Sequence, residues 1–262
     1  MGHAGDLTTQ AIVAPASRAT ARIVARESGR VAGLTAGLFS FQLLDPDART
    51  EAVKSDGLDV DAGDVLALVN ADTAAILTGE RVALNILGRA CGIATATREA
   101  VALTEGSNAV VGCTRKTPLG LRAIDKYAVR VGGGRNHRFG LDDAVMIKDN
   151  HIAAAGGLSP AIQKVRAYIG HMVKIAVEVD NLEQLDKLIE IGADTVLLDN
   201  MTPNMVAECV RRVDHRMITE ASGGIKRQDI KAFAATGVDV ISLGWLTHSA
   251  DALDVSLELE TA

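Results

Sequence analysis

The sequence predicts an α/β protein, with an α/β barrel of about seven parallel strands preceded by a small α+β open sandwich domain. From about Ser107 onward, short β-branched runs alternate with stretches of helical periodicity, as expected for repeated βα units. The first hundred residues instead contain a run of alternating apolar positions, typical of antiparallel strands. We therefore expect an N-terminal domain over residues 1–104 and a barrel over residues 105–248. A C-terminal helix in residues 249–262 is expected to pack back on the first domain.

In the N-terminal domain, the alternating run Val65 to Val69 is followed by a polar turn and a second apolar run, Thr73 to Leu77. Two short apolar runs separated by such a turn indicate a β-hairpin. A long helix is expected next, from about Gly79 to Thr104.

The barrel strands are predicted from near-continuous apolar runs, which suit parallel strands covered by helices. The runs are residues 109–113, 127–131, 144–147, 173–177, 195–198, 217–219 and 238–242. Helices are expected between them, for example Leu182 to Ile191 and Met205 to Val213. Asn181 and Thr202-Pro203 are signals for the starts of these two helices.

Composition excludes several classes of protein. With 262 residues, 48% hydrophobic and 23% charged, the chain is neither disordered nor fibrous. Its most apolar uncharged stretch, Val31 to Leu44, has about fourteen residues, whereas a membrane-spanning helix needs about 20. A net charge of −6 gives no general reason to expect nucleic-acid or anionic-membrane binding.

The cysteines and the N-terminus predict a cytoplasmic protein. The three cysteines, Cys91, Cys113 and Cys209, are widely spaced and odd in number, so neither a disulfide framework nor a CxxC metal site is indicated. The first residues also lack the basic and apolar regions of a signal peptide.

Although the net charge of the whole chain is negative, one segment is cationic. Between Arg115 and His151 there are eight Lys or Arg residues and four Asp residues, so this segment alone carries 8 − 4 = +4. An anionic ligand is the simplest functional interpretation. The alternative is a solvated, charge-rich helix face, which would account for residues such as Lys126.

The predicted strand ends are rich in polar residues, and ligands of parallel barrels bind at those ends. Cations follow the early strands, carboxylates the middle ones and glycine-rich turns the last two. The cationic side chains would bind carboxylates or phosphates. The carboxylates would bind Mg²⁺ or ribose hydroxyls, and the glycine turns would bind phosphate through backbone N–H groups. The candidates are Arg115, Lys116, Arg138, Lys148, Glu178, Asp199, Ser222, Gly223, Gly224, Ser242 and Gly244.

Each candidate also has a structural interpretation when taken singly. The acids would cap helices, the glycine pair would form a turn, and His137 and His151 would have structural roles. Together, however, they suit transfer of a phosphorylated sugar from a diphosphate leaving group to an anionic acceptor. The sequence shows no GxGxxG, Walker A, Ser-His-Asp or Cys-His pattern to favour another chemistry.

Several motifs resemble those of the quinolinate phosphoribosyltransferase family. They are GDLTT from Gly5, ERVALN from Glu80, TRKTPLGLR from Thr114, KYAVRVGGGRNHRFGLDDAVMIKDNHI from Lys126, LLDNM from Leu197, EASGGI from Glu220 and SLGWLTHS from Ser242. The resemblance covers almost the whole chain, and the block ending in IKDNHI is its most specific part. It implies the reaction of quinolinate with phosphoribosyl pyrophosphate and Mg²⁺ to give nicotinate mononucleotide, pyrophosphate and CO₂, a step of NAD biosynthesis.

The resemblance also implies roles for residues. Quinolinate would be held by Arg115, His137, Arg138 and Lys148, with Lys116 nearby. The ribose and Mg²⁺ would face Glu178 and Asp199, with the metal held mainly through the diphosphate, and the phosphates would face Ser222, Gly223, Gly224, Ser242 and Gly244. Catalytic roles would fall to Lys116, Lys148, Glu178 and Asp199. Arg81 would reach the site of a neighbouring subunit in a homodimer with shared active sites, which could assemble further.

Two features depart from the family pattern. The usual TRKTTPG is here TRKTPLG, with the proline one position earlier, and the usual helical stretch before GDLTT is absent from this sequence. One alternative is a paralogous phosphoribosyltransferase-like protein associated with molybdate transport, with a different acceptor. Another is a non-catalytic barrel that binds a phosphorylated metabolite.

Overall fold

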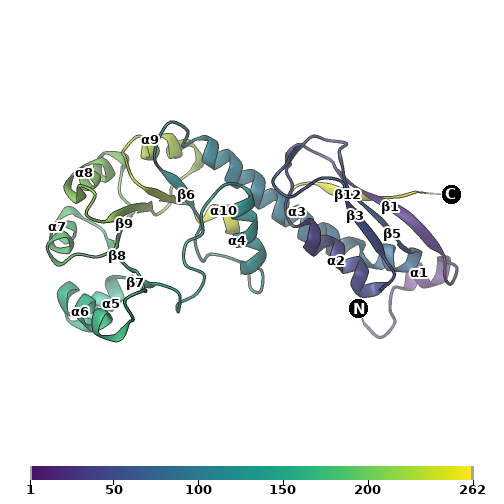
Figure 1. The fold of residues 1–262 in the computed structure, drawn as a ribbon, viewed down its shortest axis with the longest axis horizontal. Helices are drawn as coiled ribbons and strands as arrows, with labels where there is room; N and C mark the ends of the chain where they lie inside the picture. Colours follow the sequence, from purple (N-terminus) through teal and green to yellow (C-terminus); the bar gives the residue numbers. More distant parts are fainter. Residues whose placement is uncertain (1, 261–262) are drawn as a thin grey trace. The chain divides into compact units, whose positions relative to one another are not determined.

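Two units, each with its own sheet, make up this computed structural model, which describes residues 2–260 (Figure 1). The first unit contains residues 2–98, 123–133 and 249–260. The second contains residues 99–122 and 134–248. Among the described residues, no helix combines the length and apolarity needed to cross a membrane.

The first unit is built on a four-stranded antiparallel sheet in the order β12-β1-β5-β3. Its strands are β1 (Arg18–Ala25), β3 (Arg49–Ala52), β5 (Val65–Asp72) and β12 (Val255–Glu260), and β2 (Gly29–Arg30) pairs separately with β4 (Asp59–Val60). Helices α1 (Leu7–Ile12), α2 (Leu34–Leu44) and the first part of α3 (Thr73–Ala102) accompany the sheet. Ile23, Phe41, Leu66, Ile76 and Leu87 are fully buried in a shared core.

The predicted hairpin is wrong, because β5 leads directly into α3. The strand extends to Asp72 and the helix begins at Thr73. The Asp72 carboxylate accepts a hydrogen bond from the N–H of Ala74 (2.8 Å), which satisfies a free donor in the first helical turn. The supposed turn is therefore a strand end followed by a helix cap, and the run Thr73 to Leu77 is helical.

The predicted C-terminal helix is also wrong within the described residues; residues 261–262 of that prediction lie outside them. The segment joins the first unit as strand β12, antiparallel to β1, with Leu257 opposite Ile23. Apolar Val255 and Leu257 alternate with polar Ser256 and Glu258, and this period of two favours a strand.

The second unit contains a six-stranded parallel sheet in the order β6-β11-β10-β9-β8-β7. The strands are β6 (Val110–Gly112), β7 (Val145–Ile147), β8 (Ile175–Val179), β9 (Thr195–Asp199), β10 (Ile218–Ser222) and β11 (Val240–Ser242). Figure 1 shows them as a curved series with helices on the outside. The α/β class is confirmed, with six strands instead of seven, and β6 and β7 form the two edges of the described sheet.

The helices of this unit follow the strands. They are α5 (Asp149–Ala155), α6 (Leu158–Tyr168), α7 (Leu182–Ile191), α8 (Pro203–Val213), α9 (Ile230–Ala234) and α10 (Trp245–His248), with a 3₁₀ turn at Arg227–Asp229. The predicted start signals are confirmed: Asn181 accepts from the N–H of Gln184 (2.9 Å), and Thr202 caps α8 with Pro203 in its first turn.

One of the seven predicted strands, residues 127–131, is instead part of helix α4 (Arg122–Val131). Its buried positions are Asp125, Lys126, Ala128 and Val129, spaced as on one face of a helix. The β-branched residues in this short run resembled a strand, but the buried face follows the helical period. Residues 123–133 contribute to the first unit and not to the parallel sheet.

Candidate active site

Strand register brings the polar residues of the second unit onto one face of the sheet. Leu197 on β9 lies between Glu178 on β8 and Glu220 on β10, and Asp199 lies beside Ser222. Side chains two residues apart on a strand point to the same face, so the carboxylates share it.

The opposite face is apolar. Val177, Val196 and Leu198 occupy the alternate positions and are fully buried. Because each strand buries these residues, the polar residues between them are directed to the other side.

A cavity of about 650 Å³ opens on the polar face. Every predicted site residue except Arg81 lines it. These residues are Arg115, Lys116, His137, Arg138, Lys148, Glu178, Asp199, Ser222, Gly223, Gly224, Ser242 and Gly244.

Two arginines lie on adjoining loops at the cationic side of the cavity. Arg138 donates to the carbonyl oxygen of Ala144 (2.9 Å), and Arg115 donates to the carbonyl oxygen of Gly140 (3.4 Å). Partial burial lowers the pKa of the Arg138 guanidinium, and the positive charge of Arg115 lowers it further. Two cations held this close favour an anion between them.

The carboxylates have partners of their own. The Lys148 ammonium pairs with the Glu178 carboxylate, which is largely buried. Asn200 donates from Nδ2 to Oδ2 of Asp199 (2.6 Å).

Glu178 and Asp199 fit the predicted Mg²⁺ only in part. Within residues 2–260, no group of three or more His, Cys, Asp or Glu side chains is placed to hold a metal ion. Mg²⁺, however, is commonly bound by one or two carboxylates together with substrate phosphates and water. The two carboxylates therefore suit a metal ion that arrives with a diphosphate.

The glycine turn after β10 requires its glycines. Gly223 has φ of 92°, and a Cβ atom there would lie 2.6 Å from the backbone nitrogen of Asn200. Gly224 has φ of 61° but open space around it. The turn brings backbone to the cavity wall without side chains, as phosphate sites require.

Sequence reasoning missed Glu220 as a cavity residue. Glu220 is 5% exposed, and its carboxylate accepts a hydrogen bond from Ser242 Oγ and lies 3.7 Å from Nε2 of His137. Glu220 precedes Ser222 by two positions, so strand alternation was the signal that placed it on the same face.

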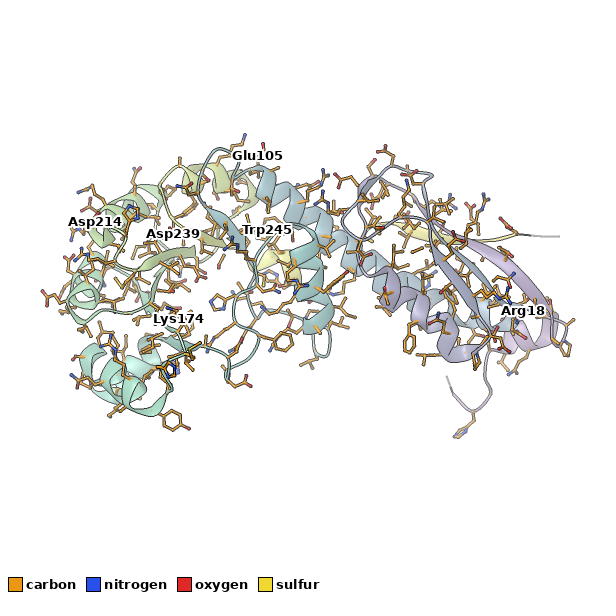
Figure 2. All side chains as sticks on the ribbon, in the orientation of Figure 1. Arg18, Glu105, Lys174, Asp214, Asp239 and Trp245 are labelled. Atoms are coloured by element: carbon orange, nitrogen blue, oxygen red, sulfur yellow. The ribbon has the colours of Figure 1, made fainter. Side chains whose placement is uncertain are left out.

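Other lining residues also lay outside the prediction. They are Thr114, Met146, Leu197, Asn200, Ile225, Lys226, Trp245 and His248. Trp245, labelled in Figure 2, donates from Nε1 to the carbonyl oxygen of Ile225 (3.1 Å). This bond links the turn after β10 to the start of α10.

Arg81 lies in the first unit, on α3, with a side chain that is 74% exposed. It borders a depression of about 350 Å³ with Asn85, Arg89 and residues 252–255, among others. Its role in the site of a neighbouring subunit stays a prediction.

Family comparisons agree with this geometry. The models of the quinolinate phosphoribosyl transferase N-terminal and C-terminal domains match residues 6–91 and 93–258. The chain belongs to the quinolinate phosphoribosyltransferase family. The resemblance inferred from the motifs is thereby confirmed.

Individual relatives of the family are similar over nearly the whole chain. A probable nicotinate-nucleotide pyrophosphorylase [carboxylating] of Bacillus subtilis (strain 168) is 47% identical, over 97% of this chain and 88% of that protein. The crystal structure of NadC from Streptococcus pyogenes matches with a TM-score of 0.92 at 38% identity, covering 98% and 92% of the two chains. The nicotinate-nucleotide pyrophosphorylase of Ehrlichia chaffeensis matches with a TM-score of 0.94 at 36% identity, covering 99% and 94%.

Proposed function

We propose that this protein transfers the phosphoribosyl group of phosphoribosyl pyrophosphate to quinolinate, with decarboxylation, in NAD biosynthesis. The products are nicotinate mononucleotide, pyrophosphate and CO₂. The observation that carries the proposal is a single cavity in which cations, carboxylates and a glycine turn converge. Relatives named nicotinate-nucleotide pyrophosphorylase support this acceptor over that of a molybdate-associated paralogue.

Acceptor binding follows from the cationic loops. Arg115, Arg138 and His137 hold the two ring carboxylates, the arginines through paired hydrogen bonds. This orients the pyridine nitrogen toward the anomeric carbon, so that binding supplies proximity without acid–base chemistry.

Transfer proceeds with positive charge developing on the ribose as pyrophosphate leaves. The carboxylates of Glu178 and Asp199 stabilise that charge. Lys148 binds the acceptor, and Lys116, near the acceptor, has its side chain beside Gly244 and so also reaches the phosphates. Glu178 and Asp199 would hold Mg²⁺ together with the diphosphate, and the ion would supply positive charge to the leaving group.

Decarboxylation follows bond formation. The pyridine nitrogen gives its lone pair to the anomeric carbon, and the ring becomes cationic. When the adjacent carboxylate leaves as CO₂, its bonding electrons pass to the ring carbon, which is then protonated. The cationic ring serves as the electron acceptor for this step.

The proposal includes a cytoplasmic homodimer with shared sites. The odd number and wide spacing of Cys91, Cys113 and Cys209 support a reducing compartment. Mixing Arg81→Ala with Lys148→Ala subunits should restore activity, because one hybrid site would keep both residues. Failure to restore activity in verified mixed dimers would contradict shared sites.

The decisive test measures CO₂ and nicotinate mononucleotide from purified protein given quinolinate or nicotinate. We expect turnover of quinolinate only with phosphoribosyl pyrophosphate and Mg²⁺ present. Turnover of nicotinate but not quinolinate would refute the proposed acceptor. Binding of phosphoribosyl pyrophosphate without any turnover would favour a non-catalytic role.

A further inference from the structure

Arg122 connects two loops beside the cavity without lining it. Its guanidinium donates from Nε to Thr117 Oγ1 (3.1 Å) and from Nη2 to the carbonyl oxygen of Arg115 (3.3 Å). From Nη1 it donates to the carbonyl oxygen of Phe139 (3.1 Å). One side chain therefore ties residues 115–117 to residue 139.

The position of Arg122 in its helix is unusual. It is the first residue of α4, where the helix dipole disfavours a cation. Three hydrogen bonds to oxygen acceptors outside the helix offset this penalty. Contacts with the two loops therefore account for an arginine at this place better than the helix does.

The two loops need such a connection because they carry like charges. The first loop bears Arg115 and the second bears His137 and Arg138. Both guanidinium groups line the same cavity, and like charges there repel each other. The lowered pKa of Arg138, due to burial and then to the charge of Arg115, agrees with this. With no anion between them, this repulsion tends to separate the loops.

Other anchors hold the rest of the two loops. The Asp143 carboxylate accepts from the N–H groups of Phe139 and Gly140. The carbonyl oxygen of Lys116 accepts from Thr247 Oγ1 (2.8 Å). Lys116 therefore has a separate connection to α10. The carbonyl oxygen of Arg115 accepts from Arg122 and, within its own loop, from the N–H of Thr117 (2.9 Å), and the Arg115 side chain adds the bond to Gly140 described above.

We propose that Arg122 is a positioning residue that sets the separation of Arg115 and Arg138, and so prepares the cavity for a dicarboxylate. The inference rests on the proposed function. It predicts that loss of Arg122 impairs use of quinolinate much more than use of phosphoribosyl pyrophosphate, because Lys116 and the glycine turn keep their own supports.

The test compares Arg122→Ala with Arg166→Ala. Arg166 is a matched control in the same unit, since it also donates to backbone carbonyls, those of Ile191 and Gly192, away from the cavity. We expect Arg122→Ala to raise the KM for quinolinate at least about tenfold, as misplaced binding groups do. In Arg122→Ala the KM for phosphoribosyl pyrophosphate should change less than about twofold. In Arg166→Ala the KM values for both substrates should change less than about twofold.

Two further measurements distinguish a positioning role of Arg122 from a general loss of protein structure. Added methylguanidinium should lower the raised quinolinate KM of Arg122→Ala toward the wild-type value, because it can occupy the space that the arginine side chain leaves. Arg122→Lys should fall between wild type and Arg122→Ala, because an ammonium lacks the planar fork that reaches both loops.

Equal KM values for quinolinate in Arg122→Ala and Arg166→Ala would overturn the inference, as would a parallel rise in both KM values. If Arg122→Ala does not fold, Thr117→Val provides the test instead. This substitution removes the hydroxyl that accepts from Arg122 Nε and keeps the shape of the side chain nearly constant. It should raise the quinolinate KM about threefold, and no change would overturn the inference. A wild-type protein that fails with quinolinate would instead refute the proposed function.

Discussion

Replacing Gly223 with alanine probes the contact between the glycine turn and Asn200, which hydrogen-bonds the Asp199 carboxylate. The new Cβ atom would lie 2.6 Å from the backbone nitrogen of Asn200, where ordinary contacts begin at 3.4 Å. Asn200 must therefore retreat by about 3.4 − 2.6 = 0.8 Å. Two hydrogen bonds of Asn200 would be stretched or lost. One runs from its backbone N–H to the carbonyl oxygen of Ser222 (3.0 Å), and the other from its side-chain Nδ2 to Oδ2 of Asp199 (2.6 Å).

The expected loss of stability has two parts. A non-glycine residue in a left-handed conformation costs about 1–2 kcal/mol. Loss of one neutral and one charged hydrogen bond adds about 2–4 kcal/mol. Gly156→Ala isolates the first part, because Gly156 is in the same unit, has φ of 85° and faces open space, so that an added Cβ atom would meet nothing within 4 Å.

Thermal unfolding measures the difference between the two variants. At about 2–4 °C per kcal/mol for chains of roughly this size, Gly223→Ala should unfold about 4–16 °C below Gly156→Ala. Displacement of Asp199 should also lower kcat/KM for phosphoribosyl pyrophosphate at least about tenfold. Equal Tm values for the two variants would refute the argument that Gly223 is required by its approach to Asn200.

Two other predictions concern single side chains. Arg115→Ala should weaken quinolinate binding by more than about 2 kcal/mol, because a desolvated carboxylate loses its charged partner; unchanged affinity in calorimetry would remove Arg115 from the site. The hydrogen bond from Tyr127 to Asp56 (2.7 Å), together with burial, raises the pKa of Tyr127 to about 12. A raised pKa stabilises the folded protein below the unfolded value of about 10, and this contribution is lost as pH rises toward 12. The stability advantage of wild type over Tyr127→Phe should therefore shrink above pH 10 in urea unfolding, and a constant difference would contradict the assignment.

Local sequence signals were sufficient where an element depends on its own residues. Helices α7 and α8 start at the predicted caps, because Asn181 and Thr202 satisfy free N–H groups within the same segment. The cationic segment likewise indicated an anion site, since charge is a property of composition. The strand ends predicted the cavity because parallel strands end at one edge of a sheet.

Local signals failed where distant partners decide the structure. The run of residues 127–131 is short enough to suit either a strand or a helix, and the alternation in residues 255–260 favours a strand over too few positions to decide alone. Burial on the face of α4 selected the helix in one case, and pairing of Leu257 with Ile23 on β1 selected the strand in the other. That strand pairing joins residues more than 200 positions apart, so no window of sequence contains it.

The sequence by itself determined the chemistry of this protein: the family motifs, the anion-binding cations and the carboxylates on the middle strands. Tertiary structure alone decided how these groups are supported. Glu220 beside His137, Asn200 against Gly223 and Arg122 between two loops are contacts made only when separate segments meet. Side-chain type is a local property, whereas distance and burial belong to the folded chain as a whole.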